Sequence, residues 1–216
     1  MAQWATARFD EIGEITDGRV PWRPVRHHFG ISSFGLNVFT GRESGDRIIN
    51  EHDEADDGSE EIYFVHSGRA RFELDGETVD APAGTFVFAE PAVKRTAFAE
   101  EPNTVLVAAG GAPGKAYSPQ GWEIWAPLVP AYEAGDYEQV ADGLRKGLAD
   151  DPPYAMLHYN AACVMSLAGH TDEALTHLRR AVQLSDAVRQ YAENDTDLEA
   201  IRGEPAFREI FPDAPA

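Results

Sequence analysis

The fold is decided by residues 45–95, which read GDRIINEHDEADDGSEEIYFVHSGRARFELDGETVDAPAGTFVFAEPAVKR. Glycine and acidic residues recur in this stretch at fixed spacings: six residues separate Glu61 from Gly68, and fifteen separate Gly68 from Gly84. Glycine is the residue that adopts turn conformations without steric cost. The spacing therefore predicts short strands joined by tight turns.

The residues between these turns have the pattern of β-strands. Along residues 61–66 two opposite strand faces are expected, with Glu61, Tyr63 and Val65 on one of them, and apolar residues recur at every second position of 34–38. Asp75 and Gly76 lie between RARFEL and ETVDAP and predict a two-residue hairpin, because type I′ turns favour Asp-Gly. Several short strands with such turn signals predict a β-barrel or β-sandwich.

The glycine spacing resembles that of the cupin family, whose fold is a small antiparallel jelly-roll β-barrel. Its first motif contains a Gly, a His-x-His pair, a Glu and a second Gly, and its second motif contains a Gly, a Pro-x-Gly turn and a His. In the family three His and the Glu hold a divalent metal at the barrel mouth. The resemblance covers about residues 30–110, with Glu61 at the position of the Glu and Arg95 at that of the last His.

Two registers are open for the His-x-His positions. Strict spacing from Gly45 places Glu51 and Asp53 there, whereas aligning His52 with the first His places Glu54 at the second. We prefer the second register, because it keeps the only nitrogen ligand and puts His52 and Glu54 on one face of a strand.

Arg95 is the main departure from the family pattern. A guanidinium stays protonated and has no lone pair for a metal, so an ion pair between Arg95 and Glu61, or an anion site, is expected. Tyr63 shares the strand face of Glu61. We therefore predict a ligand pocket without a metal cofactor, formed by His52, Glu54, Glu61, Tyr63 and Arg95. The alternative is a divalent metal ion held by His52, Glu54 and Glu61.

Residues 114–216 have a different period and an internal repeat. Gly135 precedes Gly169 by 34 residues, and apolar residues recur in the same register with helical spacing. A 34-residue helix-turn-helix period resembles tetratricopeptide repeats, most closely over HYNAACVMSLAGHTDEALTHLRRAV. The Gly- and Pro-rich segment GGAPGKAYSPQGW marks the boundary, which gives a cupin-like domain over 1–113 and a helical domain over 114–216.

Composition limits the partners and the compartment. The chain has 18 Lys and Arg against 37 Asp and Glu, a net charge of −19, which disfavours nucleic acid and anionic membranes. No apolar run is long enough to span a bilayer, and the N-terminus lacks the features of a secretory signal, so we expect a cytoplasmic protein. The lone Cys163 lies in an apolar helical segment and is expected to be a small buried hydrophobe.

The predicted fold class is β plus α: an N-terminal cupin-like jelly-roll barrel followed by a small all-α domain. The functional hypothesis is a non-catalytic protein whose barrel binds a small polar or anionic ligand and whose helices serve assembly or protein interaction. We also expect a homodimer, with Trp122 and Trp125 anchoring the helical tail. The alternatives are a metal-dependent cupin enzyme, such as an oxygenase, isomerase or epimerase, and a barrel with a purely structural role.

Overall fold

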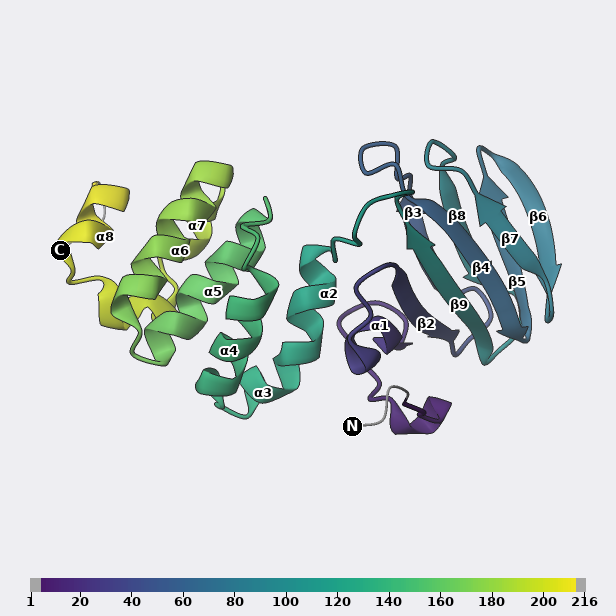
Figure 1. Ribbon diagram of the computed structural model, residues 1–216, viewed down its shortest axis with the longest axis horizontal. Helices are drawn as coiled ribbons and strands as arrows, with labels where there is room; N and C mark the ends of the chain where they lie inside the picture. The colour runs from purple at the N-terminus through teal and green to yellow at the C-terminus, as the bar shows by residue number, and fades with distance from the viewer. Residues whose placement is uncertain (1–4, 213–216) are drawn as a thin grey trace. The chain divides into compact units, whose positions relative to one another are not determined.

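The computed structural model describes residues 5–212, and the chain divides between Pro119 and Gln120 into two compact units. The first unit is a β-sandwich and the second is helical (Figure 1). The predicted order of a β domain followed by an α domain is therefore confirmed. We call them the β-sandwich unit and the helical unit.

The β-sandwich unit consists of two antiparallel sheets, with strand orders β1-β2-β9-β4-β7 and β3-β8-β5-β6. Consecutive strands such as β2 and β3, or β8 and β9, lie in different sheets, and the late strand β9 lies between β2 and β4. This is the order of a jelly roll, as predicted. The elements of the unit are η1 (Phe9–Glu11), β1 (Trp22–Arg23), α1 (Val25–Phe29), β2 (Gly35–Gly41), β3 (Arg47–His52), β4 (Glu60–Ser67), β5 (Arg69–Leu74), β6 (Glu77–Pro82), β7 (Phe86–Ala89), β8 (Arg95–Ala99) and β9 (Thr104–Gly111).

The predicted local signals are present in these strands. Asp75 and Gly76 join β5 to β6 with φ values of 50° and 87°, as a type I′ turn requires. In β4, Tyr63 and Val65 are buried between the sheets, whereas Ile62 is 44% exposed on the outer face. The alternation along residues 61–66 therefore reflects one buried face, and it directs Tyr63 into the interior.

The helical unit begins with a broken helical segment. Pro127 and Pro130 are the second residues of η2 and α3, within the first turn, where their missing N–H groups cost little, and the segment is divided into three short pieces. The elements of the unit are α2 (Gly121–Trp125), η2 (Ala126–Leu128), α3 (Val129–Glu133), α4 (Tyr137–Gly147), α5 (Ala155–Leu167), α6 (Thr171–Leu184), α7 (Val188–Ala192), η3 (Thr196–Ile201) and α8 (Pro205–Ile210).

Two glycines that stand 34 residues apart in the repeat occupy equivalent turns in the structure. Gly135 follows α3 with φ of 77°, and Gly169 follows α5 with φ of 82°, so both occupy the left-handed region that favours glycine. Each turn reverses the chain into the next helix, and α5 and α6 pack closely along their length (Figure 1). The helix-turn-helix period is thus real, and the assignment to tetratricopeptide repeats stays a prediction.

One apolar core holds the helical unit together. Leu144, Leu178 and Phe207 are almost fully buried in it, and Cys163 is buried on α5 beside Asp195. Burial and the Asp195 carboxylate raise the pKa of the Cys163 thiol, so it stays protonated and unreactive. Trp125 packs against this core. Among residues 5–212 no helix is long and apolar enough to cross a membrane.

Candidate functional site

Five side chains from three strands and one loop meet on the inner side of the β-sandwich unit. Strand β4 contributes Glu61 and Tyr63, β3 contributes His52, β8 contributes Arg95, and Glu54 follows β3. His52 and Arg95 are paired residues of β3 and β8. We call these five residues, His52, Glu54, Glu61, Tyr63 and Arg95, the Glu61 cluster. They are the five site residues that the sequence predicts, and the structure brings all of them together.

One carboxylate oxygen of Glu61 is the centre of the cluster. Its Oε2 accepts a hydrogen bond from the Tyr63 hydroxyl at 2.5 Å and from Arg95 Nε at 3.0 Å, and it lies 3.3 Å from His52 Nε2. Arg95 Nη2 is also 2.8 Å from this oxygen, although without the direction of a hydrogen bond. The predicted Arg95–Glu61 ion pair is therefore present.

Arg95 is fully buried and held from both ends. Its Nη1 donates to the backbone carbonyls of Pro91 at 3.2 Å and Val93 at 2.8 Å, both in the loop before β8. A buried charge is tolerated only when it is paired and hydrogen-bonded. The two carbonyls and the Glu61 carboxylate meet this requirement, so the interior accommodates the charge of Arg95.

The charge of Glu61 follows from these donors. Burial alone would raise the pKa of Glu61, yet hydrogen bonds from His52 and Tyr63 and the charge of Arg95 hold it below its ordinary value. Burial and the neighbouring Glu61 carboxylate raise the pKa of the Tyr63 hydroxyl. Glu61 is therefore an anion at neutral pH, and Tyr63 is a neutral donor to it.

Both ring nitrogens of His52 face oxygen acceptors. Nδ1 lies 2.7 Å from the carbonyl oxygen of Asn50, and Nε2 lies 3.3 Å from Glu61 Oε2. Only the doubly protonated ring can donate to both, and the hydrogen bond to Glu61 accordingly raises the pKa of His52 against the opposing effect of burial. This arrangement favours His52 as an imidazolium, which has no lone pair for a metal.

Glu54 completes the cluster at its more exposed edge. Its Oε1 lies 3.7 Å from His52 Nε2, and burial, followed by repulsion from Glu61, raises the pKa of its carboxyl group. Glu51 instead faces solvent and pairs with Lys94 at 2.7 Å, and Asp53 is exposed. Of the two registers that the sequence leaves open, the structure has the one with His52 and Glu54 facing Glu61.

A divalent metal fits these residues poorly. One ligand atom from each of His52, Glu54 and Glu61 can lie within 4.8 Å of the others, which is close enough for a shared ion. However, the Arg95 guanidinium lies 2.8 Å from the Glu61 oxygen, and the one imidazole is turned toward two acceptors. A cation there would meet a fixed positive charge and a protonated ring, so the donor set favours hydrogen bonding over coordination.

Residues outside the predicted site also shape the space around the cluster. A Cβ on Gly110 would lie 2.8 Å from Glu61 Cγ, so only glycine leaves room for the Glu61 side chain. Gly110 pairs with Gly35, and the Tyr117 ring covers Gly35 so closely that a Cβ there would lie 2.7 Å from it. Gly110 and Tyr117 lie in the Gly- and Pro-rich segment that is predicted to be the boundary between the two domains. The structure shows that Gly110 belongs to β9 and that Tyr117 lies against β2.

Solved structures similar to this chain cover about half of it. KdgF from Halomonas sp. is 16% identical with a TM-score of 0.41, over 50% of this chain and 93% of that one. A cupin protein from Bacteroides fragilis is 16% identical with a TM-score of 0.41, over 56% and 93%. PAC13 from Streptomyces, in a structure with uridine, is 16% identical with a TM-score of 0.38, over 51% and 83%. No protein-family model and no curated protein matches the sequence.

Proposed function

We propose that the β-sandwich unit binds a small polar ligand at the Glu61 cluster without catalysing a reaction, and that the helical unit serves assembly or protein interaction. The proposal of non-catalytic binding rests on one observation: Glu61 Oε2 already contacts Tyr63, Arg95 and His52 within hydrogen-bond distance. A general base or nucleophile needs a carboxylate that can turn to its substrate, whereas this one is held by three side chains. Its arrangement supports a fixed recognition surface.

The charges of the cluster indicate which ligands suit it. Arg95 carries positive charge, Glu61 carries negative charge, and the raised pKa values of His52 and Glu54 favour the protonated forms of both groups. The side chains of His52 and Glu54 are 33% and 21% exposed, so they are the groups that a ligand would reach. This near balance favours a neutral, hydroxyl-bearing ligand over a strongly charged one.

A thermal-shift panel of sugars, hydroxy acids and nucleosides tests the proposal. We expect one class to raise the melting temperature of the full chain, and His52→Gln to reduce that rise, because His52 would contact the ligand. Glu51→Gln is the matched control, since Glu51 lies next to His52 but faces solvent. A rise of the same size in His52→Gln would place binding elsewhere.

Measuring the metal content of the same protein distinguishes a metal-dependent enzyme from the proposed non-catalytic binding protein. A metal-dependent enzyme is favoured by one observation, the close approach of His52, Glu54 and Glu61. We expect untagged, dialysed protein to contain far less than one transition metal ion per chain. A content near one ion per chain would contradict the proposal and support the enzyme.

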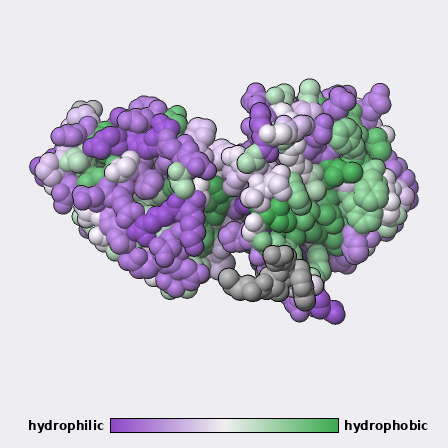
Figure 2. All heavy atoms as spheres, viewed as in Figure 1, coloured by the Kyte–Doolittle hydropathy of each residue, from purple (hydrophilic) through white to green (hydrophobic). Residues whose placement is uncertain are grey.

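The outer face of the sheet β1-β2-β9-β4-β7 supports a homodimer formed by the β-sandwich unit, in addition to the interaction role proposed for the helical unit. Ile62, Phe86 and Phe88 are 44%, 66% and 54% exposed, and Ile62 pairs with Phe88 across β4 and β7. Hydrophobic residues gather on one side of the β-sandwich unit (Figure 2). Exposed apolar clusters on a sheet with an open edge strand are characteristic of interaction surfaces. We propose that this face meets its counterpart in a homodimer.

Light scattering of the full chain is expected to give the mass of a dimer. Phe88→Glu should convert it to a monomer, because two charges would face each other across an isologous contact. Tyr191→Glu, at a similarly exposed aromatic residue of the helical unit, should leave the dimer intact. A monomeric wild-type chain would contradict the dimer, and a dimeric Phe88→Glu variant would assign it to another surface.

A further inference from the structure

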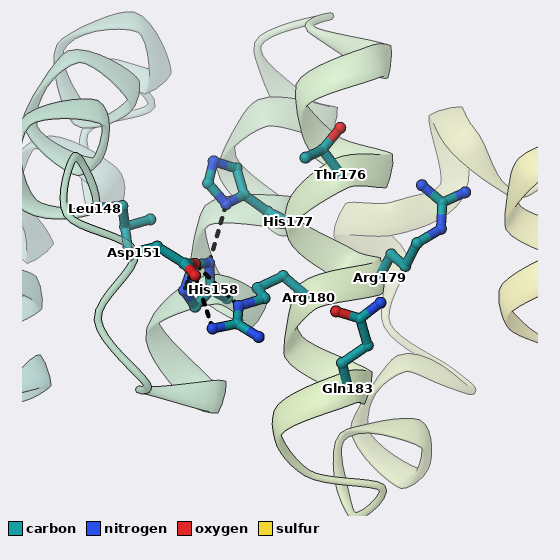
Figure 3. A pocket seen from close by; sticks show the side chains of 8 residues that line it. All are labelled: Leu148, Asp151, His158, Thr176, His177, Arg179, Arg180 and Gln183. Carbon is teal, nitrogen blue, oxygen red and sulfur yellow. Dashed lines mark hydrogen bonds and ion pairs between the residues drawn. The ribbon is translucent and has the colours of Figure 1, made fainter.

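We propose that the helical unit contains a second binding site, a pocket of about 280 Å³ that holds the oxyanion group of a small metabolite, such as a phosphate or a carboxylate. The pocket lies between α5, α6 and the loop after α4 (Figure 3). Its volume is near the lower limit for small-molecule sites. It is separate from the Glu61 cluster, and the inference does not depend on the function proposed for that cluster.

The pocket is rich in cationic and donor groups. Arg179, Arg180 and Gln183 project from α6, and His177 lies about one turn before Arg180 (Figure 3). Two guanidinium groups in one pocket stand out in a chain with a net charge of −19. Guanidinium groups bind oxyanions through paired N–H donors, so the lining matches an anion in charge and in hydrogen bonding.

The acidic residues near the pocket leave the guanidinium of Arg179 available to bind an anion. Asp151 is the one acidic residue of the lining, and both its oxygens are used by Arg180, at 2.9 Å to Nε and 2.7 Å to Nη2. Among the described residues Arg179 has one carboxylate within 4.0 Å, that of Glu209, whose side chain is 77% exposed. Glu209 lies outside the lining. An anion that displaces this loose contact would find Arg179 ready to donate.

A histidine pair at the base of the pocket adds a group that can change charge. His158 Nε2 lies 3.1 Å from the carbonyl oxygen of Pro152, to which it must donate, so the Nδ1 of a neutral His158 is an acceptor. His177 Nδ1 lies 3.1 Å from that nitrogen and therefore donates to it. This leaves His177 Nε2 with the lone pair that takes up the next proton.

Protonation of His177 would couple anion binding to pH. Burial, and then His158, lower the pKa of His177, while Glu173 and Asp151 oppose this effect and Arg145 adds to it. Arg145 and Glu173 pair with each other at 2.9 Å, so their effects on His177 offset each other. Because an anion favours the protonated ring, linkage requires that the protonated ring favours the anion. Binding should therefore tighten as pH falls.

Calorimetric titration with sulfate tests the site, since sulfate remains a dianion throughout. At constant ionic strength the full chain is expected to bind sulfate roughly fivefold to tenfold more tightly at about pH 5 than at about pH 7.5, with the increase falling below the ordinary imidazole pKa of about 6.5 because burial lowers the pKa of His177. Arg179→Gln should weaken binding by at least about fivefold. His177→Gln should remove the pH dependence. Arg208→Gln is the matched control, because Arg208 is exposed on α8 outside the pocket.

Competition experiments then identify the class of oxyanion. Displacement of sulfate by inorganic phosphate but not by malonate would assign a phosphate-bearing ligand, and the reverse would assign a carboxylate. Equal sulfate affinity in Arg179→Gln and Arg208→Gln, or no heat beyond that of chloride at matched ionic strength, would overturn the site. Neither result bears on the Glu61 cluster, whose test uses His52→Gln.

Discussion

Replacing Arg95 by alanine is expected to lower the free energy of unfolding of the β-sandwich unit by about 3–5 kcal/mol. Arg95 is fully buried, and its removal leaves the Glu61 carboxylate without its permanent cation and the carbonyl of Val93 without its donor, whereas the carbonyl of Pro91 keeps the N–H of Glu54 at 2.8 Å. Urea denaturation of the full chain, followed by a probe of the β-sandwich unit, measures the loss. An unchanged unfolding midpoint would show that Arg95 does not stabilise the interior.

Three further variants show what the guanidinium contributes. Arg69→Ala, on β5, removes a solvent-exposed pair with Asp80 and should have a much smaller effect. Arg95→Lys keeps the charge but loses the planar fork, so its stability should lie between wild type and Arg95→Ala. Arg95→His removes the cation and places an imidazole beside Glu61, which should make the cluster bind divalent metal more tightly than wild type does. Failure of Arg95→His to gain metal would mean that the other ligands are badly placed.

Replacing Gly68 by alanine is expected to be the second most damaging of these changes. Gly68 joins β4 to β5 with φ of 72°, and a Cβ there would lie 2.4 Å from Thr104 Oγ1 and 2.8 Å from Thr104 Cα. The left-handed backbone costs roughly 1–2 kcal/mol and overpacking a further ~1–3 kcal/mol. Thr104 cannot retreat easily, because it is buried and its hydroxyl donates to the carbonyl of Glu101 at 2.7 Å.

Gly84→Ala separates the two contributions. Gly84 also has a positive φ, of 89°, but nothing lies within 4 Å of the position of its Cβ. Its replacement should cost only the backbone part, about 1–2 kcal/mol. Equal losses of stability in Gly68→Ala and Gly84→Ala, measured by urea denaturation, would show that the contact with Thr104 is relieved at no cost.

These two glycines show why the jelly roll could be predicted from the sequence. Turn conformations, the Asp75-Gly76 hairpin and the alternation along residues 61–66 are local properties, and local sequence determines them. Gly110 is different. The sequence does not assign it to a strand, because a glycine inside a strand and one in a linker look the same in sequence. What requires Gly110 is the Glu61 side chain on the neighbouring strand, a contact between residues far apart in the chain.

The members of the Glu61 cluster could be predicted, but their register could not be fixed. Counting along a strand assumes that successive side chains alternate between faces. The pairing of β3 with β8 shifts register between Arg47 and Ile49, and again between Ile49 and His52, so this counting fails just before the site. The pocket of the helical unit could not be predicted, since His158 and Arg180 lie in the repeat but match no binding-site motif, and they line one pocket only when α5 packs on α6.

Because Cys163 is buried, its rate of chemical modification measures how often the helical unit opens, independently of the β-sandwich unit. Because this is the only cysteine in the chain, the rate at which a thiol reagent modifies the native protein reports on opening of the helical core alone. In urea the same reaction follows the helical unit while other probes follow the β-sandwich unit. Whether the two units unfold together or independently can thus be measured without cutting the chain or adding a label.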